Sequence, residues 1–304
     1  MIRGLMQSFF RRFPQVEFAY WAWRTRAQRA GLPRYRVLSL EETIRLIAQE
    51  QKSITRYGDG EFNNILKVSK PHYQANDDRL GRILQEALTA ERDDLIVAIP
   101  GPLHSLEGEQ LSSKYFWVRY LNTHGAKLKS LLHPQRLYGN AGISRFYLGL
   151  EDKNRAFHLA QQLKTIWDKR EVLVVEGEFS RLGVGNDLFA NAASLHRILG
   201  PSTNAFAHYD AILDAAVQHG KDKLILLALG PTATAMSYDL ACRGCWAVDI
   251  GHVDVEYMWM LQKATHKIPL EGRFVSETSE QADYAIPAAY RESYEQSIIM
   301  KIGV

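Results

Sequence analysis

The stretch Lys223-Leu-Ile-Leu-Leu-Ala-Leu229 and the Gly230-Pro-Thr-Ala-Thr234 that follows it indicate the fold of this chain. The first run has the length and the apolar character of a strand that is buried on both faces. Gly230 and Pro231 mark a turn, after which a proline suits the first turn of a helix. The sequence therefore predicts several buried strands that lead into loops and helices. Similar apolar runs occur at 95–99, 171–175 and 246–250.

Helical segments separate these strands. A short strand is expected at 53–57, and Ser39 is expected to cap a helix whose first turn is acidic. Apolar strands separated by helices of about 10–15 residues are typical of a parallel sheet that is covered on both faces. We therefore predict an α/β fold with one doubly wound, mainly parallel, Rossmann-like domain over residues 41–277, between a helical segment (1–40) and a tail (278–304). Further helices are predicted at 77–90, 112–124, 152–169, 186–199, 208–219, 231–243 and 253–264.

The composition excludes several protein classes. Of the 304 residues, 46% are apolar and 23% are charged, which rules out a disordered or fibrous chain. Two cysteines are too few for a disulfide scaffold and fit a reducing compartment. No apolar run approaches the roughly 18 residues of a membrane-spanning helix. The expected location is the cytoplasm.

The net charge of +3 is distributed unevenly along the chain. Residues 1–40 contain eight Arg, no Lys and one acid, Glu17, so this aromatic-rich segment carries +7 and the other 264 residues carry −4. Three interpretations are open: a helix packed on the main domain, a helix on an anionic membrane surface, or a nucleic-acid-binding segment. Because no basic surface continues after residue 40, no nucleic-acid partner is expected.

In open parallel sheets, ligands bind beyond the carboxyl ends of the strands, and four such positions here are polar or rich in glycine. The first is Arg56-Tyr-Gly-Asp-Gly-Glu-Phe62. Asp59 and Glu61 reach one point only if the backbone turns between them, which Gly58 and Gly60 allow. Two carboxylates together with substrate phosphate oxygens suit Mg²⁺ or Mn²⁺. The alternative is a polar turn without a ligand.

The second position follows the strand at 171–175. Gly183 and Gly185 precede the predicted helix start near Asn186, and Arg181 lies close by in the sequence. Free amide groups at a helix start, with an arginine beside them, form an anion site. The alternative is an ordinary glycine loop in which Asn186 caps the helix.

The third position is the turn Gly230-Pro-Thr-Ala-Thr234, where the hydroxyl groups of Thr232 and Thr234 are expected to face the start of the helix. It is a second candidate phosphate cradle. In the fourth, Asp249-Ile-Gly-His-Val-Asp-Val-Glu-Tyr257, the side chains of His252, Asp254 and Glu256 share one face if the segment is extended and diverge if it is helical. Acids, an arginine, a histidine and glycines on one sheet edge indicate a site for a phosphorylated, metal-bridged substrate.

These four segments, in this order and spacing, closely resemble the bacterial glycosyltransferases of the GT-D fold over residues 50–277. The resemblance implies a metal-dependent transferase that takes a sugar from a nucleotide-sugar donor, typically UDP-glucose. It also implies a glycan acceptor in the synthesis of surface polysaccharide or protein-linked glycans. A lipid-linked acceptor would give the segment 1–40 a purpose at the inner face of the membrane.

The resemblance also implies roles for individual residues. The family's Asp-x-Glu metal motif falls on Asp59 and Glu61, and His252 matches a histidine at the family's last strand end, which is expected beside the Mn²⁺ or Mg²⁺ ion or the reacting centre. If the transfer inverts the sugar's anomeric centre, a base is needed, and Asp187, Asp254 and Glu256 are the candidates. A retaining reaction does not strictly require one. The implied donor-binding residues are Arg56, Gly58, Arg181, Gly183, Gly185, Asn186, Gly230, Pro231, Thr232 and Thr234.

Two other functions compete with this one. A metal-dependent phosphohydrolase or nuclease would use the same site, with Asp59, Glu61, His252 and Asp254 holding one or two metal ions and water replacing the sugar acceptor. A nucleotide-binding module without catalytic activity is the third possibility. Acceptor-independent hydrolysis of a UDP-sugar would favour the hydrolase, and donor binding without turnover would favour the binding module.

Overall fold

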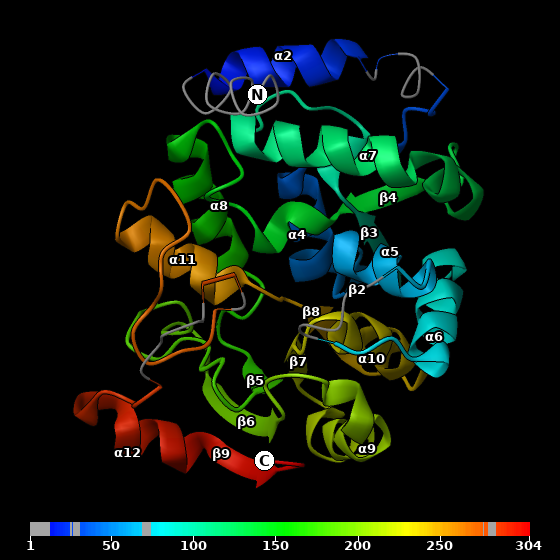
Figure 1. Cartoon of the computed structure of the whole chain (residues 1–304). Helices are drawn as coiled ribbons and strands as arrows, with labels where there is room; N and C mark the ends of the chain where they lie inside the picture. The colour runs from blue at the N-terminus through cyan, green and yellow to red at the C-terminus, as the bar shows by residue number, and fades with distance from the viewer. Residues whose placement is uncertain (1–12, 25, 27–30, 69–73, 276, 279–283) are drawn as a thin grey trace.

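The computed structural model describes residues 13–24, 26, 31–68, 74–275, 277–278 and 284–304. Within them, nine strands form one sheet in the order β1-β4-β3-β2-β8-β7-β5-β6-β9, and every neighbouring pair runs parallel. The predicted α/β fold is thereby confirmed (Figure 1). The strands are β1 (Arg36–Val37), β2 (Ser53–Arg56), β3 (Leu95–Ile99), β4 (Leu137–Asn140), β5 (Glu171–Gly177), β6 (Ser194–Gly200), β7 (Leu224–Ala228), β8 (Trp246–Asp249) and β9 (Ile298–Lys301).

Helices cover both faces of this sheet. Successive residues of its central strands accordingly pack into two different cores, one on each face. In β7, Leu224 and Leu226 belong to one core, whereas Ile225 and Leu227 belong to the other. The first core is completed by α4, α8 and α11, and the second by α5, α6, α7, α9 and α10. The bounds are α4 (Leu40–Glu50), α5 (Asp59–Ile65), α6 (Asp78–Thr89), α7 (Leu111–Leu131), α8 (Lys153–Lys164), α9 (Tyr209–Gly220), α10 (Pro231–Cys242) and α11 (Val253–Leu261).

The helix predicted at 186–199 is wrong. These residues form a loop and then β6, which pairs with β5 along seven residues, from Glu171↔Ser194 to Gly177↔Gly200. The charged Arg197 interrupts the apolar pattern that would have indicated a strand. In the structure its guanidinium group is buried against the Glu176 carboxylate of the neighbouring strand. A paired charge of this kind is tolerated inside a protein, although its sequence reads as polar.

The order of the strands places a crevice between β2 and β8. These two strands are neighbours, yet the chain leaving β2 runs to β3, on the side away from β8. Reversals of this kind open the carboxyl edge of a sheet to ligands. Short 3-10 helices follow the carboxyl ends of β3 and β4 on the same edge, at η1 (Gly101–Leu103) and η2 (Ala141–Ser144).

The segments outside the predicted domain attach to it at opposite ends (Figure 1). Helix α2 (Pro14–Arg24) packs on α7, where the Tyr115 hydroxyl donates to the Glu17 carboxylate at 2.7 Å. The rest of the basic segment at 1–12, 25 and 27–30 lies outside the described residues. Helix α12 (Ala288–Ser297) leads into β9, which pairs with β6 at the sheet edge. In the described part of the chain, every helix is too short or too polar to cross a membrane.

Candidate functional site

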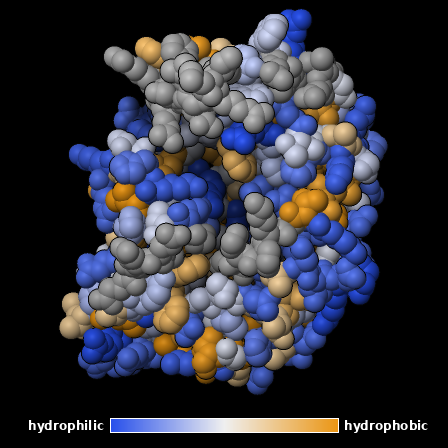
Figure 2. All heavy atoms as spheres, viewed as in Figure 1, coloured by the Kyte–Doolittle hydropathy of each residue, from blue (hydrophilic) through white to orange (hydrophobic). Residues whose placement is uncertain are grey.

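A cavity of about 1160 Å³ lies at the carboxyl edge of the sheet. Figure 2 shows the hollow near the centre of one face, bordered by hydrophilic side chains. Its walls come from the ends of β2, β3, β7 and β8, from η2 and from α5, α7 and α11. The predicted meeting of strand-end segments therefore occurs, and it includes two walls, α7 and η2, to which the sequence pattern does not point.

Arg56, at the end of β2, links the end of β8 to η2 through hydrogen bonds. Its Nη2 and Nε atoms donate to the side chain and the carbonyl of Asp249 at 2.6 and 2.7 Å. It also donates to the Ala141 carbonyl at 3.3 Å and to the Ser144 hydroxyl, both in η2. Gly251 has a φ of +45°, and a Cβ atom there would collide with the guanidinium group. Arg56 lines the cavity, but most of its hydrogen-bonding capacity is used inside the protein.

The Thr side chains of the Gly230–Thr234 turn point into the protein. Thr234 donates to the Asp249 carboxylate and to the Arg56 carbonyl, each at 2.9 Å. Thr232 is buried and donates to the Gln74 side chain at 3.1 Å. Only Gly230 and Pro231 of this turn line the cavity, so any contact with a ligand here comes from the helix start and not from the hydroxyl groups.

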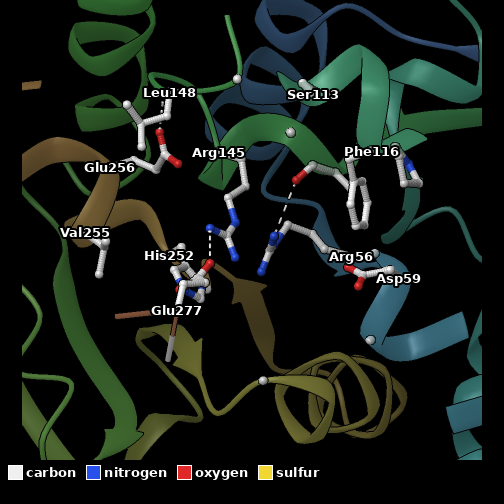
Figure 3. A pocket seen from close by; sticks show the side chains of 18 of the residues that line it. Arg56, Asp59, Ser113, Phe116, Arg145, Leu148, His252, Val255, Glu256 and Glu277 are labelled. Carbon is white, nitrogen blue, oxygen red and sulfur yellow. Dashed lines mark hydrogen bonds and ion pairs between the residues drawn. The ribbon is translucent and has the colours of Figure 1, made fainter. Parts of the chain in front are cut away.

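Asp59 and Glu61 lie together at the start of α5, with Gly58 as the N-cap. The Glu61 Oε2 atom accepts a hydrogen bond from the Gly58 amide at 2.7 Å. Burial and the nearby Asp249 carboxylate raise the pKa of Glu61 to about 7. In the described part of the chain, no hydrogen bond or ion pair engages the exposed Asp59 carboxylate, which lines the cavity (Figure 3).

His252 is engaged by a cluster on another wall of the cavity (Figure 3). Its Nε2 atom is 3.0 Å from Glu277 Oε2, and Arg145 donates to Glu277 Oε1 at 2.7 Å. Burial and the Arg145 charge lower the pKa of His252, so the neutral ring is favoured. Burial opposes ionisation of Glu277, but the bond from His252 and the charges of Arg145 and Lys267 hold its pKa well below the usual range.

The positions of Asp59, Glu61 and His252 bear on the metal site that the sequence predicts. No three His, Cys, Asp or Glu side chains within the described ranges are grouped as a set of metal ligands. Asp59 and Glu61 remain suited to a divalent cation, since Mg²⁺ is commonly held by one or two carboxylates, water and substrate phosphates. His252 lies on another wall of the cavity, where its Nε2 atom contacts Glu277, and its role beside a metal ion stays a prediction.

Asp254 and Glu256 diverge, because the segment after β8 is the helix α11. The Asp254 carboxylate accepts from the Gly183 amide at 2.9 Å and from the Asn186 side chain at 2.7 Å, and it pairs with Arg273. The Glu256 carboxylate accepts from the backbone amides of Tyr147 and Leu148 at 2.9 and 2.8 Å. Both acids border the cavity, but their oxygens organise the loops around it.

The glycine loop after β5 is not a helix start. Gly183 and Gly185 both have a φ of +77°, and the loop bends around Asp254. Arg181 is buried and donates to the carbonyls of Gly272 and Tyr284. Asp187 accepts from Lys164 at 2.6 Å and from the Tyr257 hydroxyl at 2.7 Å, and these bonds lower its pKa. The predicted residues that do not appear among the described residues lining the cavity are Arg181, Gly183, Gly185, Asn186, Asp187, Thr232 and Thr234.

The sequence pattern points neither to Arg145 nor to Glu277. Arg145 follows η2 and β4, and the four residues of β4 include Gly139 and Asn140, so they carry no strand signal. Glu277 stands at the end of the predicted domain, 25 residues after His252 in the chain. Only the folding of both segments over the sheet edge brings these side chains together.

Comparisons with known proteins identify the family of this chain. The family model described as "Glycosyltransferase GT-D fold" matches residues 54–278. The "Probable glycosyl transferase Gly" of Streptococcus gordonii is 36% identical over 270 residues, which are 88% of this chain and 39% of that protein. The "Glycosyltransferase GlyD" of Streptococcus pneumoniae serotype 4 is 34% identical over 267 residues, which are 88% of this chain and 32% of that protein. The chain thus spans less than half the length of these curated relatives.

Two solved structures share the whole architecture. One, reported under the statement that "the highly conserved domain of unknown function 1792 has a distinct glycosyltransferase fold", gives a TM-score of 0.86 at 33% identity and covers 92% of this chain and 100% of that chain. The other, "a new glycosyltransferase (DUF1792) from Streptococcus sanguinis", gives a TM-score of 0.82 at 35% identity and covers 88% of this chain and 100% of that chain. The family predicted from the sequence is confirmed: the chain belongs to the glycosyltransferases of the GT-D fold.

Proposed function

We propose that this protein is a metal-dependent hexosyltransferase. It takes the sugar from a nucleotide-sugar donor, a UDP-hexose such as UDP-glucose, and passes it to a lipid- or protein-linked glycan in bacterial surface glycan synthesis. The observation that carries the proposal is the exposed Asp59 carboxylate, which lies beside Glu61 at the strand-end cavity and has no hydrogen bond or ion pair to any of the residues that the structure describes. The cavity, at about 1160 Å³, has room for a nucleotide sugar.

Asp59 and Glu61 would hold a Mn²⁺ or Mg²⁺ ion together with phosphate oxygens of the donor. Such an ion neutralises the charge that develops on the departing diphosphate. The chain supplies further positive potential at the same edge. The N-termini of α5 and α10 border the cavity, and positive helix ends favour anions. Arg145 and Lys267 also line the cavity, and together they place two cationic side chains around the single Glu277 carboxylate.

The positions of the three candidate bases inform the reaction's stereochemistry. Asp254 and Glu256 are tied to backbone amides, and Asp254 also to Arg273, while Asp187 is held by Lys164 and Tyr257. None of the three is a free carboxylate in the cavity. This arrangement supports a transfer that uses none of them as the base, and it favours retention of the anomeric configuration.

The proposal is tested by measuring UDP binding and donor turnover with and without Mn²⁺, for the wild type and Asp59→Asn. We expect UDP to bind more tightly with Mn²⁺ in the wild type, and this gain to disappear in the variant. Equal UDP-glucose consumption with and without a glycan acceptor would support the phosphohydrolase instead. Metal-independent UDP binding by both proteins would contradict the assignment of Asp59.

A further inference from the structure

One wall of the cavity has a chemistry that the proposed function leaves unused. Helix α7 and the residue before its N-cap present Glu109, Ser113, Phe116 and Trp117 to the cavity. Glu109, Ser113 and Phe116 follow one another at intervals of four and three residues, and Trp117 comes four residues after Ser113, so all four lie along one face of the helix. Apart from Glu109 this wall carries no charge, whereas the strand-end walls contain charged side chains.

Phe116 is exposed, although it is a large apolar side chain on a cavity wall. Its side chain is 43% accessible, and Figure 3 shows the ring beside Asp59, on the other side of the cavity from His252 and Glu277. The ring stacks on Tyr120 with the centroids 6.0 Å apart and meets Trp117 edge-on at 5.2 Å. Apolar surface left in water is unfavourable, so a ligand face that covers this ring gains binding free energy.

The aromatic side chains Phe116, Trp117 and Tyr120 are linked to α5, the helix that carries the acidic pair Asp59 and Glu61. The Tyr120 hydroxyl donates to the Asn63 side chain of α5 at 3.0 Å, which holds α7 against α5. A group bound on Phe116 therefore lies beside Asp59, where the transferred sugar and its acceptor must meet. The base of the donor nucleotide is separated from its diphosphate by a ribose and belongs farther away.

The polar part of this wall is also arranged for a ligand. The Ser113 hydroxyl donates to Glu109 Oε2 at 2.6 Å, and burial raises the pKa of Glu109. A carboxylate accepts up to about four hydrogen bonds, so Glu109 has capacity for hydroxyl groups of a ligand. A pyranose ring combines one face of C–H groups, which stacks on an aromatic ring, with a rim of hydroxyl groups that seek such acceptors.

We propose that Phe116, with Trp117 beside it and Glu109 and Ser113 at one end, forms the subsite that binds the acceptor's terminal sugar ring. This inference rests on the proposed function and adds where the acceptor binds. The acceptor ring stacks on Phe116, and its hydroxyl groups bond to the Glu109 carboxylate. The ring is thereby held over the acidic pair with one hydroxyl group directed at the donor sugar.

The first test uses the full chain and methyl glycosides of common hexoses as probes, with binding followed by saturation-transfer NMR and by Trp fluorescence. We expect at least one glycoside to bind the wild type, and Phe116→Ala to weaken it about tenfold. Phe157→Ala is the matched control, because Phe157 on α8 is 53% exposed and lies outside the cavity lining. The polar end of the subsite is tested by Glu109→Gln. Its matched control is Glu107→Gln, because Glu107 is exposed and lies outside the cavity lining. Absence of glycoside binding, or equal losses in Phe157→Ala, would overturn the subsite.

The second test separates this inference from the proposed function. The second assay uses Mn²⁺, UDP-glucose and, as acceptor, the glycoside that binds in the first test. Phe116→Ala is expected to raise KM for this acceptor about tenfold. The donor KM and the rate of donor hydrolysis without acceptor should stay within about twofold of the wild-type values. A matching rise in donor KM would assign the ring to the donor sugar or base instead. If the wild type turns over no UDP-sugar, the proposed function fails. The glycoside measurements then still decide whether the subsite at Phe116 binds sugars.

Discussion

The two sides of the cavity differ in how their polar groups are used. At the strand ends, Arg56, Asp249 and Thr234 satisfy one another inside the protein. On the side of α5 and α7, Asp59 has no partner in the described structure and Phe116 is left exposed. The residues closest to the sheet thus build the edge, and those one layer farther out are available to ligands. Substitutions on the two sides should therefore fail in different ways.

The largest expected effect is on folding, from Arg56→Met. The Arg56 side chain is 14% exposed and that of Asp249 is 2% exposed, so the substitution leaves a buried carboxylate without its ion pair. Losses of this kind cost about 3–5 kcal/mol. Urea unfolding would measure the change. Arg45→Met is the control, because the exposed Arg45–Glu50 pair contributes at most about 1 kcal/mol. A similar small loss in both variants would remove the distinction between the two sides.

Asp59→Asn should show the opposite behaviour. No partner within the described residues is lost, so we expect stability within about 0.5 kcal/mol of the wild type. If Asp59 is a ligand of the proposed cation, sugar transfer should fall on the order of 100-fold, because the amide is a weaker metal ligand than the carboxylate. Asp78→Asn is the matched control, since Asp78 also opens its helix, α6, and lies outside the cavity lining. A destabilised Asp59→Asn would show that this side, too, is structural.

Glu256 offers a pH test of the structural side. Burial, opposed by Arg145 and by the amides of Leu148 and Tyr147, raises the pKa of Glu256 above its ordinary value of 4.5. The folded protein therefore binds more protons at this site than the unfolded chain, and stability falls as the pH rises from 4.5 through the raised pKa. Glu256→Gln removes that dependence, so its stability relative to the wild type should improve with rising pH over this window. Thermal melting from pH 4 to 8 measures it, with Glu271→Gln as the exposed control.

The smallest effect on the site is expected from deleting residues 1–30. Helix α2 packs on α7, yet Trp23 is 70% exposed, so part of this segment faces away from the domain. Donor hydrolysis should persist, while stability should fall by more than the roughly 1 kcal/mol of the Glu17–Tyr115 hydrogen bond, because the packing of α2 on α7 is lost as well. Binding to anionic vesicles in a flotation assay should be lost, because the six Arg and one Glu of residues 1–30 carry +5. Vesicle binding that survives the deletion would leave α2 with a packing role alone.

Part of the fold could be predicted from local patterns. Strands β3, β5, β7 and β8 are buried on both faces, so each appears in the sequence as an apolar run. Ser39 forms the predicted N-cap, with Glu42 completing a capping box. The edge strands β1 and β9, the neighbouring β4 and the ion-paired β6 could not be predicted in this way. They are short or carry polar side chains, and their stability comes from the neighbouring strand.

The parallel sheet, the family and the strand-end segments that meet at one edge could be inferred before the structure was known, because strand burial and turn chemistry are local properties. Which polar side chains are available to a ligand follows only from the folded arrangement. Arg181, Thr234 and Asp254 look like ligand-binding groups in the sequence, yet each is engaged by residues 15 to 178 positions away in the chain. Phe116 is a large apolar side chain within a predicted helix, and only the structure shows that it is exposed on the cavity wall. A buried polar group must find a partner, and partners distant in sequence are known only once the chain is folded.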